Sequence, residues 1–214
     1  PWVSAEGKFF DNLRDPDALS EIKAETMSPN GGWEALADLV GPENTMPVGL
    51  YKEENQQYVG KRLTEIGEMR GEDWFDAAIH LFLSEEQRIA AIYYSMDEEN
   101  VKRKLRQPWV MIGTDAGGTD PEWARRLGPV HPRGNGSYAR ILGKYVREEK
   151  VLSIEDAVRK MSGAVAARLG IRNRGLLMEG LQADVVLFDP ETIIDNATFK
   201  DPHQVATGVL FVWV

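Results

Sequence analysis

The sequence contains no cysteine, so the chain can form no disulfide and offers no thiolate for metal binding or nucleophilic catalysis. Its three histidines, His80, His131 and His203, lie too far apart for a His-x-His or His-x-x-x-His metal motif. No apolar run approaches about 18 residues, the length that would indicate a membrane-spanning helix. The formal net charge of −9 argues against nucleic acid or an anionic membrane as the main partner, because both require a positive field.

The length and the two ends of the chain are also informative. The 214 residues correspond to one or two domains at about 150 residues per domain, and a complete TIM barrel of about 250 residues with further domains does not fit. The first residue is Pro1, and residues 210–214 form an apolar run typical of a strand. Because a natural protein seldom stops within such a run, we expect a piece of a longer protein. No signal-peptide pattern is visible.

Hydrophobic periodicity predicts a mixed α/β chain. Residues 1–45 are largely irregular, and the spacing favours helices over 16–26, 33–40, 55–70, 73–83, 97–105, 137–148 and 153–169. Apolar runs predict strands over 47–51, 89–95, 108–113, 183–188 and 209–214. The order strand, helix, strand over 89–113 indicates a parallel βαβ unit. The change from helical to strand periodicity predicts a domain boundary near residue 172.

The loop after the apolar run 108–113 carries the first candidate for chemistry. Asp115 follows directly where that predicted buried strand ends. Active sites of α/β folds lie at this end of the strands, because the loops there converge. Asp115 is therefore a candidate metal ligand, general base or both. The same position is equally compatible with an aspartate that only caps the following turn.

The same loop carries a candidate for binding a carboxylate. The planar guanidinium of Arg133 can bind a carboxylate with two parallel hydrogen bonds, although an exposed arginine in a surface loop is the simpler reading. His131 is a candidate ligand or proton carrier. His80 is expected to be structural and His203 to be exposed. A zinc site needs three or four protein ligands, and these residues alone are too few.

Several stretches resemble a known family. The segment from Asn173 to Asp189, with Gly180-Leu181-Gln182-Ala183-Asp184 at its centre, resembles the closing segment of the amidohydrolase superfamily. Three further stretches resemble the N-acyl-D-amino-acid deacylases (D-aminoacylases) of that superfamily. They are Ile-Gly-Thr-Asp at 112–115, His-Pro-Arg-x-x-Gly-Ser-Tyr-Ala-Arg-x-Leu-Gly at 131–143, and Asp-Pro-x-Thr-x-x-Asp-x-Ala-Thr-Phe at 189–199.

This resemblance implies a fold and an activity. The implied fold is α/β: the C-terminal portion of a TIM-like (β/α)8 barrel over 1–172, with 1–45 as a lid-like excursion, and a partial β-sandwich over 173–214. The implied reaction is zinc-dependent hydrolysis of the amide of an N-acyl-D-amino acid, a small-molecule substrate. Asp115 matches the family's catalytic aspartate, which lies on the metal side and moves a proton from water to the leaving amine. Arg133 matches an arginine that holds the substrate α-carboxylate.

The departures from the family pattern are equally specific. The family's His-x-His, its metal-binding cysteine and its two later histidine ligands have no counterpart here. We therefore expect zinc to be held by a longer parent, and this chain alone to hold no metal and to be inactive. Val165 stands where proline is expected, and Ala116 where glycine is usual.

Two alternatives remain open. One is an amidohydrolase that opens cyclic amides in the manner of dihydroorotase or hydantoinase. The other is a non-catalytic assembly module that self-associates through exposed strand edges.

Overall fold

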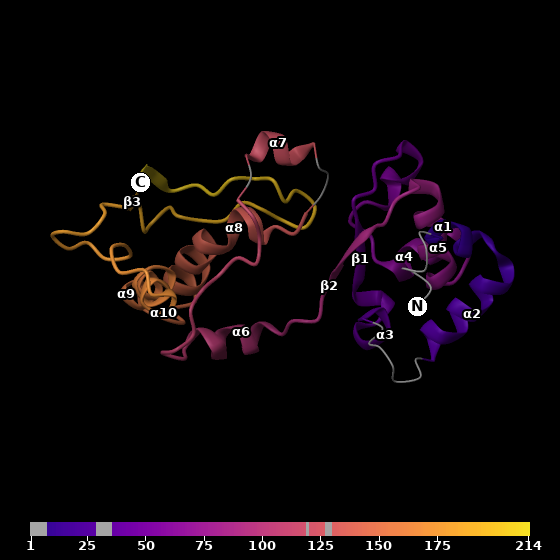
Figure 1. Cartoon of the computed structure of the whole chain (residues 1–214), viewed down its shortest axis with the longest axis horizontal. Coiled ribbons are helices and arrows are strands. Elements are labelled where there is room, and N and C mark those ends of the chain that lie inside the picture. The colour runs from indigo at the N-terminus through magenta and orange to yellow at the C-terminus, as the bar shows by residue number, and fades with distance from the viewer. Residues whose placement is uncertain (1–7, 29–35, 119, 127–129) are drawn as a thin grey trace. The chain divides into compact units, whose positions relative to one another are not determined.

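The computed structural model describes residues 8–28, 36–118, 120–126 and 130–214. Within these residues the chain packs as two compact units, the first ending at Ser95 and the second beginning at Met96 (Figure 1). Among the described helices, none combines the length and the apolar character that a membrane span requires.

The first unit consists of short helices and one two-stranded sheet. Its helices are α1 (Phe9–Arg14), α2 (Pro16–Met27), α3 (Leu36–Val40), η1 (Pro42–Asn44), η2 (Glu53–Tyr58), α4 (Leu63–Arg70) and α5 (Trp74–Glu85). Strands β1 (Thr45–Val48) and β2 (Ala90–Tyr93) pair antiparallel, with Thr45 opposite Tyr93. The helices α4 and α5 pack together through buried side chains, among them Ile66 and Leu81.

Two carboxylates hold this unit together. Asp73 caps α5 by accepting hydrogen bonds from the backbone N–H groups of Phe75 (2.9 Å) and Asp76 (3.0 Å), and it also binds the Lys23 ammonium. Glu85, only 6% exposed, accepts hydrogen bonds from the backbone N–H groups of Tyr51 (3.0 Å) and Lys52 (3.2 Å). Each carboxylate therefore links a helix to a segment distant in sequence.

The second unit is built on a bundle of helices followed by a β-ribbon. Its helices are α6 (Glu98–Leu105), α7 (Pro121–Arg125), α8 (Arg133–Arg140), the π-helix η3 (Ile141–Glu148), α9 (Ile154–Met161) and α10 (Gly163–Leu169). Strands β3 (Val185–Phe188) and β4 (Val209–Trp213) pair antiparallel, with Val185 opposite Trp213. One apolar core joins α6, α8, η3 and α9 to the loop at Ile193.

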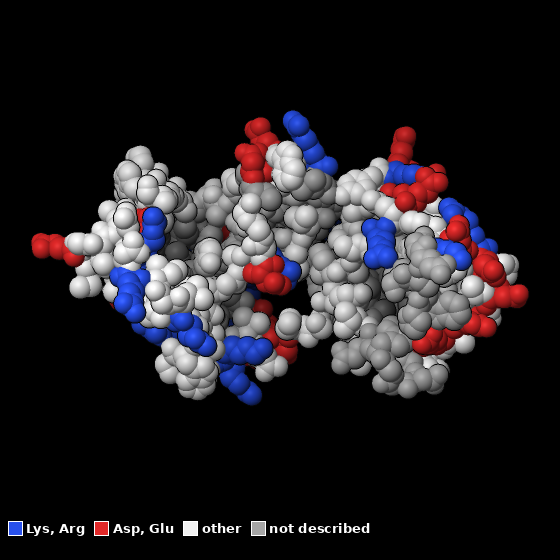
Figure 2. All heavy atoms as spheres, viewed as in Figure 1, with Lys and Arg blue, Asp and Glu red and all other residues white. Residues whose placement is uncertain are grey.

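Charged side chains of both signs appear on the visible face of each unit (Figure 2). Basic side chains gather over the part of the second unit that contains α6, α9 and α10, and acidic side chains gather over α2 (Figure 2). The sequence of α2 agrees with this view, because it carries Asp17, Glu21 and Glu25 but only one lysine. The chain therefore has a local basic surface although its net charge is negative.

The structure corrects the predicted βαβ unit. Residues 108–113 form no strand: Trp109 and Met111 are 72% and 37% exposed, and the Ile112 N–H donates to the carbonyl of Lys160 at 3.1 Å. The neighbour of β2 is β1, and that pair is antiparallel. An apolar run favours a strand only when another strand offers a ladder of hydrogen bonds, and in the described chain α9 supplies the partner instead.

Several predicted helices are confirmed and others are divided. The helices predicted over 16–26, 73–83 and 97–105 are present, as are strands over 183–188 and 209–214. The helix predicted over 55–70 is wrong in its first half, because Gly60 takes a φ of +78° between η2 and α4. The helix predicted over 153–169 breaks at Ser162, whose hydroxyl donates to the carbonyl of Gly175 at 2.8 Å.

One further predicted helix differs in its bounds and type, and other predictions fall on residues that the structure does not describe or stay predictions. The helix predicted over 137–148 begins earlier, at Arg133, and its second half is the π-helix η3. The first residues of the helix predicted over 33–40, and residues 1–7, lie outside the described part of the chain. The boundary near residue 172 and the lid-like role of 1–45 stay predictions.

Candidate active site

Asp115 lies in a tight turn of the second unit. Its backbone is left-handed, with a φ of +49°, a conformation that aspartate and asparagine adopt more readily than most residues. Thr114 stabilises the turn, because its hydroxyl donates to the carbonyl of Ala116 (3.2 Å) and accepts the N–H of the same residue (3.3 Å). The Asp115 side chain is 87% exposed, so its carboxylate points away from the core.

Arg133 is the first residue of α8 and reaches Asp115. Its Nη1 lies 2.9 Å from Oδ2 of Asp115, and the arginine side chain is 43% exposed. The two residues singled out from the sequence, 18 positions apart, therefore form an ion pair. A guanidinium offers five N–H donors and a carboxylate two oxygens, so one contact uses only part of the capacity of either group.

His131 stands at the start of the same helix. Its Nδ1 accepts the backbone N–H of Arg133 at 3.1 Å, and its ring meets the Phe199 ring edge-on at 5.1 Å. Burial, together with the Arg133 charge, holds the pKa of His131 below its ordinary 6.5, against an opposing effect of Asp115. A neutral His131 with its proton on Nε2 fits these contacts, because Nδ1 is already an acceptor.

The other histidines do not join this cluster. His80 lies on α5 in the first unit, where burial lowers its pKa. His203, which the sequence predicted to be exposed, is only 6% exposed, and this prediction is wrong. The Asn135 amide donates to the carbonyl of Pro202 at 2.9 Å, which binds the turn that carries His203 to α8.

Among the residues that the structure describes, no group of three or more histidine, aspartate or glutamate side chains is arranged to hold a metal ion. Asp115 is paired with a cation, and His131 directs Nδ1 to a backbone N–H. Since a zinc site needs three or four protein ligands, Asp115 can contribute one of them at most.

The sequence reading missed a group of residues that binds the segment leading to Asp115. Lys160 on α9 is completely buried, and its ammonium donates to the carbonyls of Leu105 and Gln107. A lysine at an inward position of a predicted helix is the signal that was available, because lysine is almost never fully buried unless its charge has partners.

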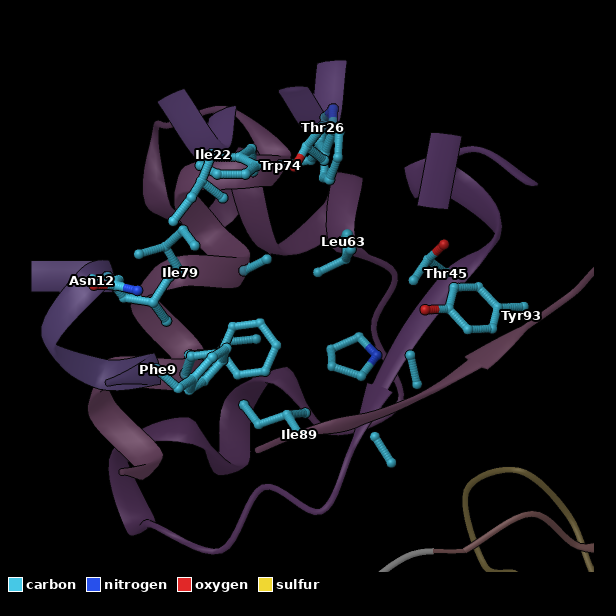
Figure 3. Close-up of a pocket in the computed structure, with 18 residues that line it drawn as sticks. Phe9, Asn12, Ile22, Thr26, Thr45, Leu63, Trp74, Ile79, Ile89 and Tyr93 are labelled. Carbon is cyan, nitrogen blue, oxygen red and sulfur yellow. The ribbon is translucent and has the colours of Figure 1, made fainter. Parts of the chain in front are cut away.

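A second feature missed from the sequence is an apolar pocket of about 310 Å³ in the first unit. Figure 3 shows Phe9 and Ile89 on one side and Tyr93 on the other, with the Tyr93 hydroxyl pointing inward. Burial raises the pKa of Tyr93, so this hydroxyl is neutral at neutral pH. The pocket is lined by residues of the first unit and contains neither Asp115 nor Arg133.

Comparison with known proteins then identifies the family. A family model described as "Amidohydrolase family" matches residues 65–214, about 70% of the chain. The chain belongs to the amidohydrolase family.

Two of its relatives are deacylases. The chain is 40% identical over 153 residues to an N-acyl-D-aspartate deacylase and 39% identical over 155 residues to a D-aminoacylase, both from Alcaligenes xylosoxydans xylosoxydans. These matches cover 69% and 72% of this amidohydrolase chain, and 29% and 30% of the relatives. The chain thus spans less than a third of the length of the curated relatives it matches.

A solved structure agrees with these matches. The crystal structure of an N-acyl-D-glutamate deacylase from Bordetella bronchiseptica matches with a TM-score of 0.66 at 32% identity, over 81% of this chain and 34% of that one. That crystal contains zinc and a phosphonate inhibitor that mimics the tetrahedral intermediate of the reaction. The mixed α/β structure described above therefore matches part of that deacylase structure.

Proposed function

We propose that this chain is part of a zinc-dependent amidohydrolase that hydrolyses the amide bond of N-acyl-D-amino acids. In the longer protein, residues 1–172 form the C-terminal portion of a TIM-like (β/α)8 barrel, and residues 173–214 belong to a small β-sandwich. The observation that carries the proposal is the contact between Asp115 and Arg133 at 2.9 Å. It brings together a proton carrier and a carboxylate-binding group, the two functions that this substrate class requires.

Each of the two side chains has a defined task in the proposed reaction. Arg133 binds the substrate α-carboxylate, because its planar guanidinium matches a carboxylate with paired hydrogen bonds. Asp115 accepts a proton from the attacking water and returns it to the amine nitrogen when the C–N bond breaks. The products are a carboxylate and a free amino acid, so no oxidant or further reactant is needed.

The exposure of the pair supports this division of work. Arg133 and Asp115 keep 43% and 87% of their side-chain surface accessible, so a substrate carboxylate can compete for the guanidinium. A substrate carboxylate that displaces Asp115 from Arg133 would free the aspartate to contact the attacking water. Substrate binding at Arg133 is therefore coupled to the state of the group that performs the chemistry.

Zinc enters the proposal through the longer protein. The described residues do not make a complete zinc site, and we propose that the remaining ligands lie in the part of the relatives' length that this chain does not span. A bound zinc ion would supply polarisation of the scissile carbonyl and activation of water. We expect the 214-residue chain with added zinc to be inactive, and turnover of N-acetyl-D-amino acids by it would contradict this part of the proposal.

The role of Arg133 can be tested with a matched pair of substrates. In the full-length enzyme, Arg133→Ala should lower kcat/KM for an N-acetyl-D-amino acid about 30- to 1000-fold, since a charge-assisted pair is worth about 2–4 kcal/mol. The corresponding α-carboxamide carries no carboxylate, and its kcat/KM should change less than about threefold. Arg126→Ala, an exposed arginine of the same region, serves as the control.

Three outcomes would contradict the proposal. Equal losses for the carboxylate and the carboxamide would show that Arg133 does not bind the α-carboxylate. Undiminished turnover by Asp115→Asn would remove its role in proton transfer. Hydrolysis of a cyclic amide without any hydrolysis of N-acetyl-D-amino acids would favour the dihydroorotase-like or hydantoinase-like alternative.

A second candidate function, self-association, is favoured by one observation. All five residues of β4 are exposed, from 44% for Val209 to 59% for Phe211 and Val212, although the strand is apolar. We propose that the β3–β4 ribbon can pair with another copy through its edges. Analytical ultracentrifugation should show association that depends on concentration and that Phe211→Lys reduces. Leu169→Lys, at an exposed position of α10, is the control and should leave the association unchanged. A chain that is monomeric at all concentrations would contradict this second proposal.

A further inference from the structure

Lys160 is a fully buried cation with a complete set of partners. It lies on α9 with 0% of its surface exposed. Its Nζ donates to the carbonyl of Leu105 at 2.5 Å and to the carbonyl of Gln107, and it lies 3.4 Å from Oδ2 of Asp156. An ammonium has three N–H donors, so three acceptors compensate for its removal from water.

The neighbouring residue extends the same set of contacts. Nη2 of Arg159 donates to the carbonyl of Pro108 at 2.8 Å, and Asp156 Oδ1 holds the guanidinium at 2.8 and 3.0 Å. The backbone carbonyl of Lys160 in turn accepts the N–H of Ile112 at 3.1 Å. Two consecutive residues of α9 thus bind four backbone groups of the segment 105–112.

This segment depends on those contacts because, among the residues that the structure describes, its other backbone hydrogen bonds are few and local. Leu105 is the last residue of α6, where helix carbonyls have no partner within the helix. Residues 108–113 are not paired in a sheet. Apart from the bonds to α9, the backbone–backbone bonds that the described residues make with this segment are local ones, such as Val110 N–H to the carbonyl of Gln107 at 3.2 Å. The contacts with α9 therefore determine the course of the backbone over 105–112.

The position of Asp115 depends on the backbone conformation of the segment 105–112. It lies three residues beyond Ile112, a reach of at most about 11 Å along an extended chain. Its side chain is 87% exposed and contacts Arg133, so little packing of its own fixes it. A displacement of the 105–112 backbone would consequently move the carboxylate.

We propose that Lys160 and Arg159 are positioning residues that hold the segment 105–112 on α9 and thereby set the place of the Asp115 carboxylate. The inference rests on the proposed function, in which Asp115 carries the proton. Neither residue touches the substrate, and both act through the backbone. The alternative is that Lys160 only terminates α6 and contributes to stability.

The first experiment measures the segment itself in the 214-residue chain. Lys160→Met keeps the length of the side chain and removes its ammonium, and amide hydrogen exchange over 105–112 should become at least about tenfold faster, including the N–H of Ile112. Exchange in η3 should change much less. Lys104→Met, the same substitution at an exposed site next to Leu105, is the control and should leave exchange at Ile112 unchanged.

A second variant guards against misfolding. Arg159 is 46% exposed and makes a single contact with the segment, so Arg159→Met should fold and should show a smaller acceleration over the same residues. Acceleration spread evenly over the whole second unit by both variants would overturn the positioning role, because it would show a general loss of stability.

The second experiment measures catalysis in the full-length enzyme, corrected for the folded fraction. Lys160→Met should lower kcat about 10- to 100-fold, the effect expected of a displaced catalytic group, with KM changed less than about threefold. Combined with Asp115→Asn, it should cause almost no further loss, because the group it positions is already gone.

The outcomes separate the two proposals. If Asp115→Asn abolishes turnover while Lys160→Met leaves kcat unchanged or acts additively, the positioning role is wrong and the proposed function stands. If Asp115→Asn turns over normally, the proposed function is wrong, and with it the catalytic meaning of the contacts on α9.

Discussion

Replacement of Gly143 by alanine tests the packing of the second unit in a place where two effects oppose each other. Gly143 lies in the π-helix η3, and a Cβ there would lie 2.6 Å from the carbonyl oxygen of Ile193 and 3.3 Å from Cα of Ile194. Both obstacles are backbone atoms, which cannot rotate away. Ile193 is 2% exposed, and its carbonyl also accepts a hydrogen bond from Nη1 of Arg147 at 2.6 Å.

The magnitude follows from these distances. Moving the contact with Ile193 from 2.6 Å to an ordinary 3.4 Å requires a shift of 3.4 − 2.6 = 0.8 Å. Alanine gains about 1 kcal/mol over glycine in a helix, whereas overpacking costs about 1–3 kcal/mol. Because the obstacle is buried backbone that already bonds Arg147, we take the upper end of the cost. The expected net loss for Gly143→Ala is about 2 kcal/mol.

Hydrogen exchange detected by mass spectrometry is the suitable assay, because it separates the two units. A loss of about 2 kcal/mol corresponds to roughly 30-fold faster exchange over 139–146. Gly113→Ala is the matched control, since a Cβ at Gly113 would meet nothing within 4 Å. Exchange that is unchanged or slower in Gly143→Ala would refute the reasoning, because helix propensity would then outweigh the predicted clash.

Three further predictions concern the two carboxylates of the first unit. Asp73→Ala should lower the free energy of unfolding by about 1 kcal/mol in urea denaturation, because it removes the cap of α5. The hydrogen bond from Lys23 holds the pKa of Asp73 below its ordinary 3.8. The stabilisation from ionised Asp73 is therefore fully present above that value and is lost as the pH falls through the folded-state pKa. In acid titrations followed by circular dichroism, the stabilities of wild type and Asp73→Asn should converge. A stability difference that stays constant down to about pH 2 would contradict this assignment. Glu85→Ala removes the buried carboxylate that accepts hydrogen bonds from the N–H groups of Tyr51 and Lys52. Thermal unfolding should show that it lowers the free energy of unfolding by about 2–4 kcal/mol. The control Glu86→Ala, at an exposed position, should lower it by less than about 0.5 kcal/mol.

The fold was predictable where local signals agree with each other. The helical spacing over 73–83 predicted α5, and the apolar runs over 183–188 and 209–214 predicted β3 and β4. The strand predicted over 108–113 was wrong, because the apolar character of a segment does not show whether a partner strand is present. The carbonyl partner of Ile112 belongs to Lys160, 48 residues later, and no local pattern encodes such a pairing.

The two residues of the candidate site could be predicted from the sequence, but the contact between them could not. The sequence pointed to Asp115 and Arg133 separately, and their ion pair depends on how α8 folds back against the turn at Thr114. The position of Lys160 on its predicted helix indicates burial, but its acceptors could not be read from the sequence, because they are backbone carbonyls that become available only once α6 ends at Leu105. The burial of His203 could not be read either, and the carbonyl of the preceding Pro202 accepts a hydrogen bond from Asn135, 67 residues away in the sequence.

The left-handed backbone of Asp115 has a consequence for natural variation at this position. A φ of +49° is strongly unfavourable for β-branched side chains and tolerable for aspartate, asparagine and glycine. Of these three, only aspartate can accept a proton as a carboxylate. The backbone conformation and the proposed chemistry therefore both restrict which residue can stand at position 115. An evolving chain that gave up the acid would be expected to pass first to asparagine or glycine, the two replacements that leave the turn intact.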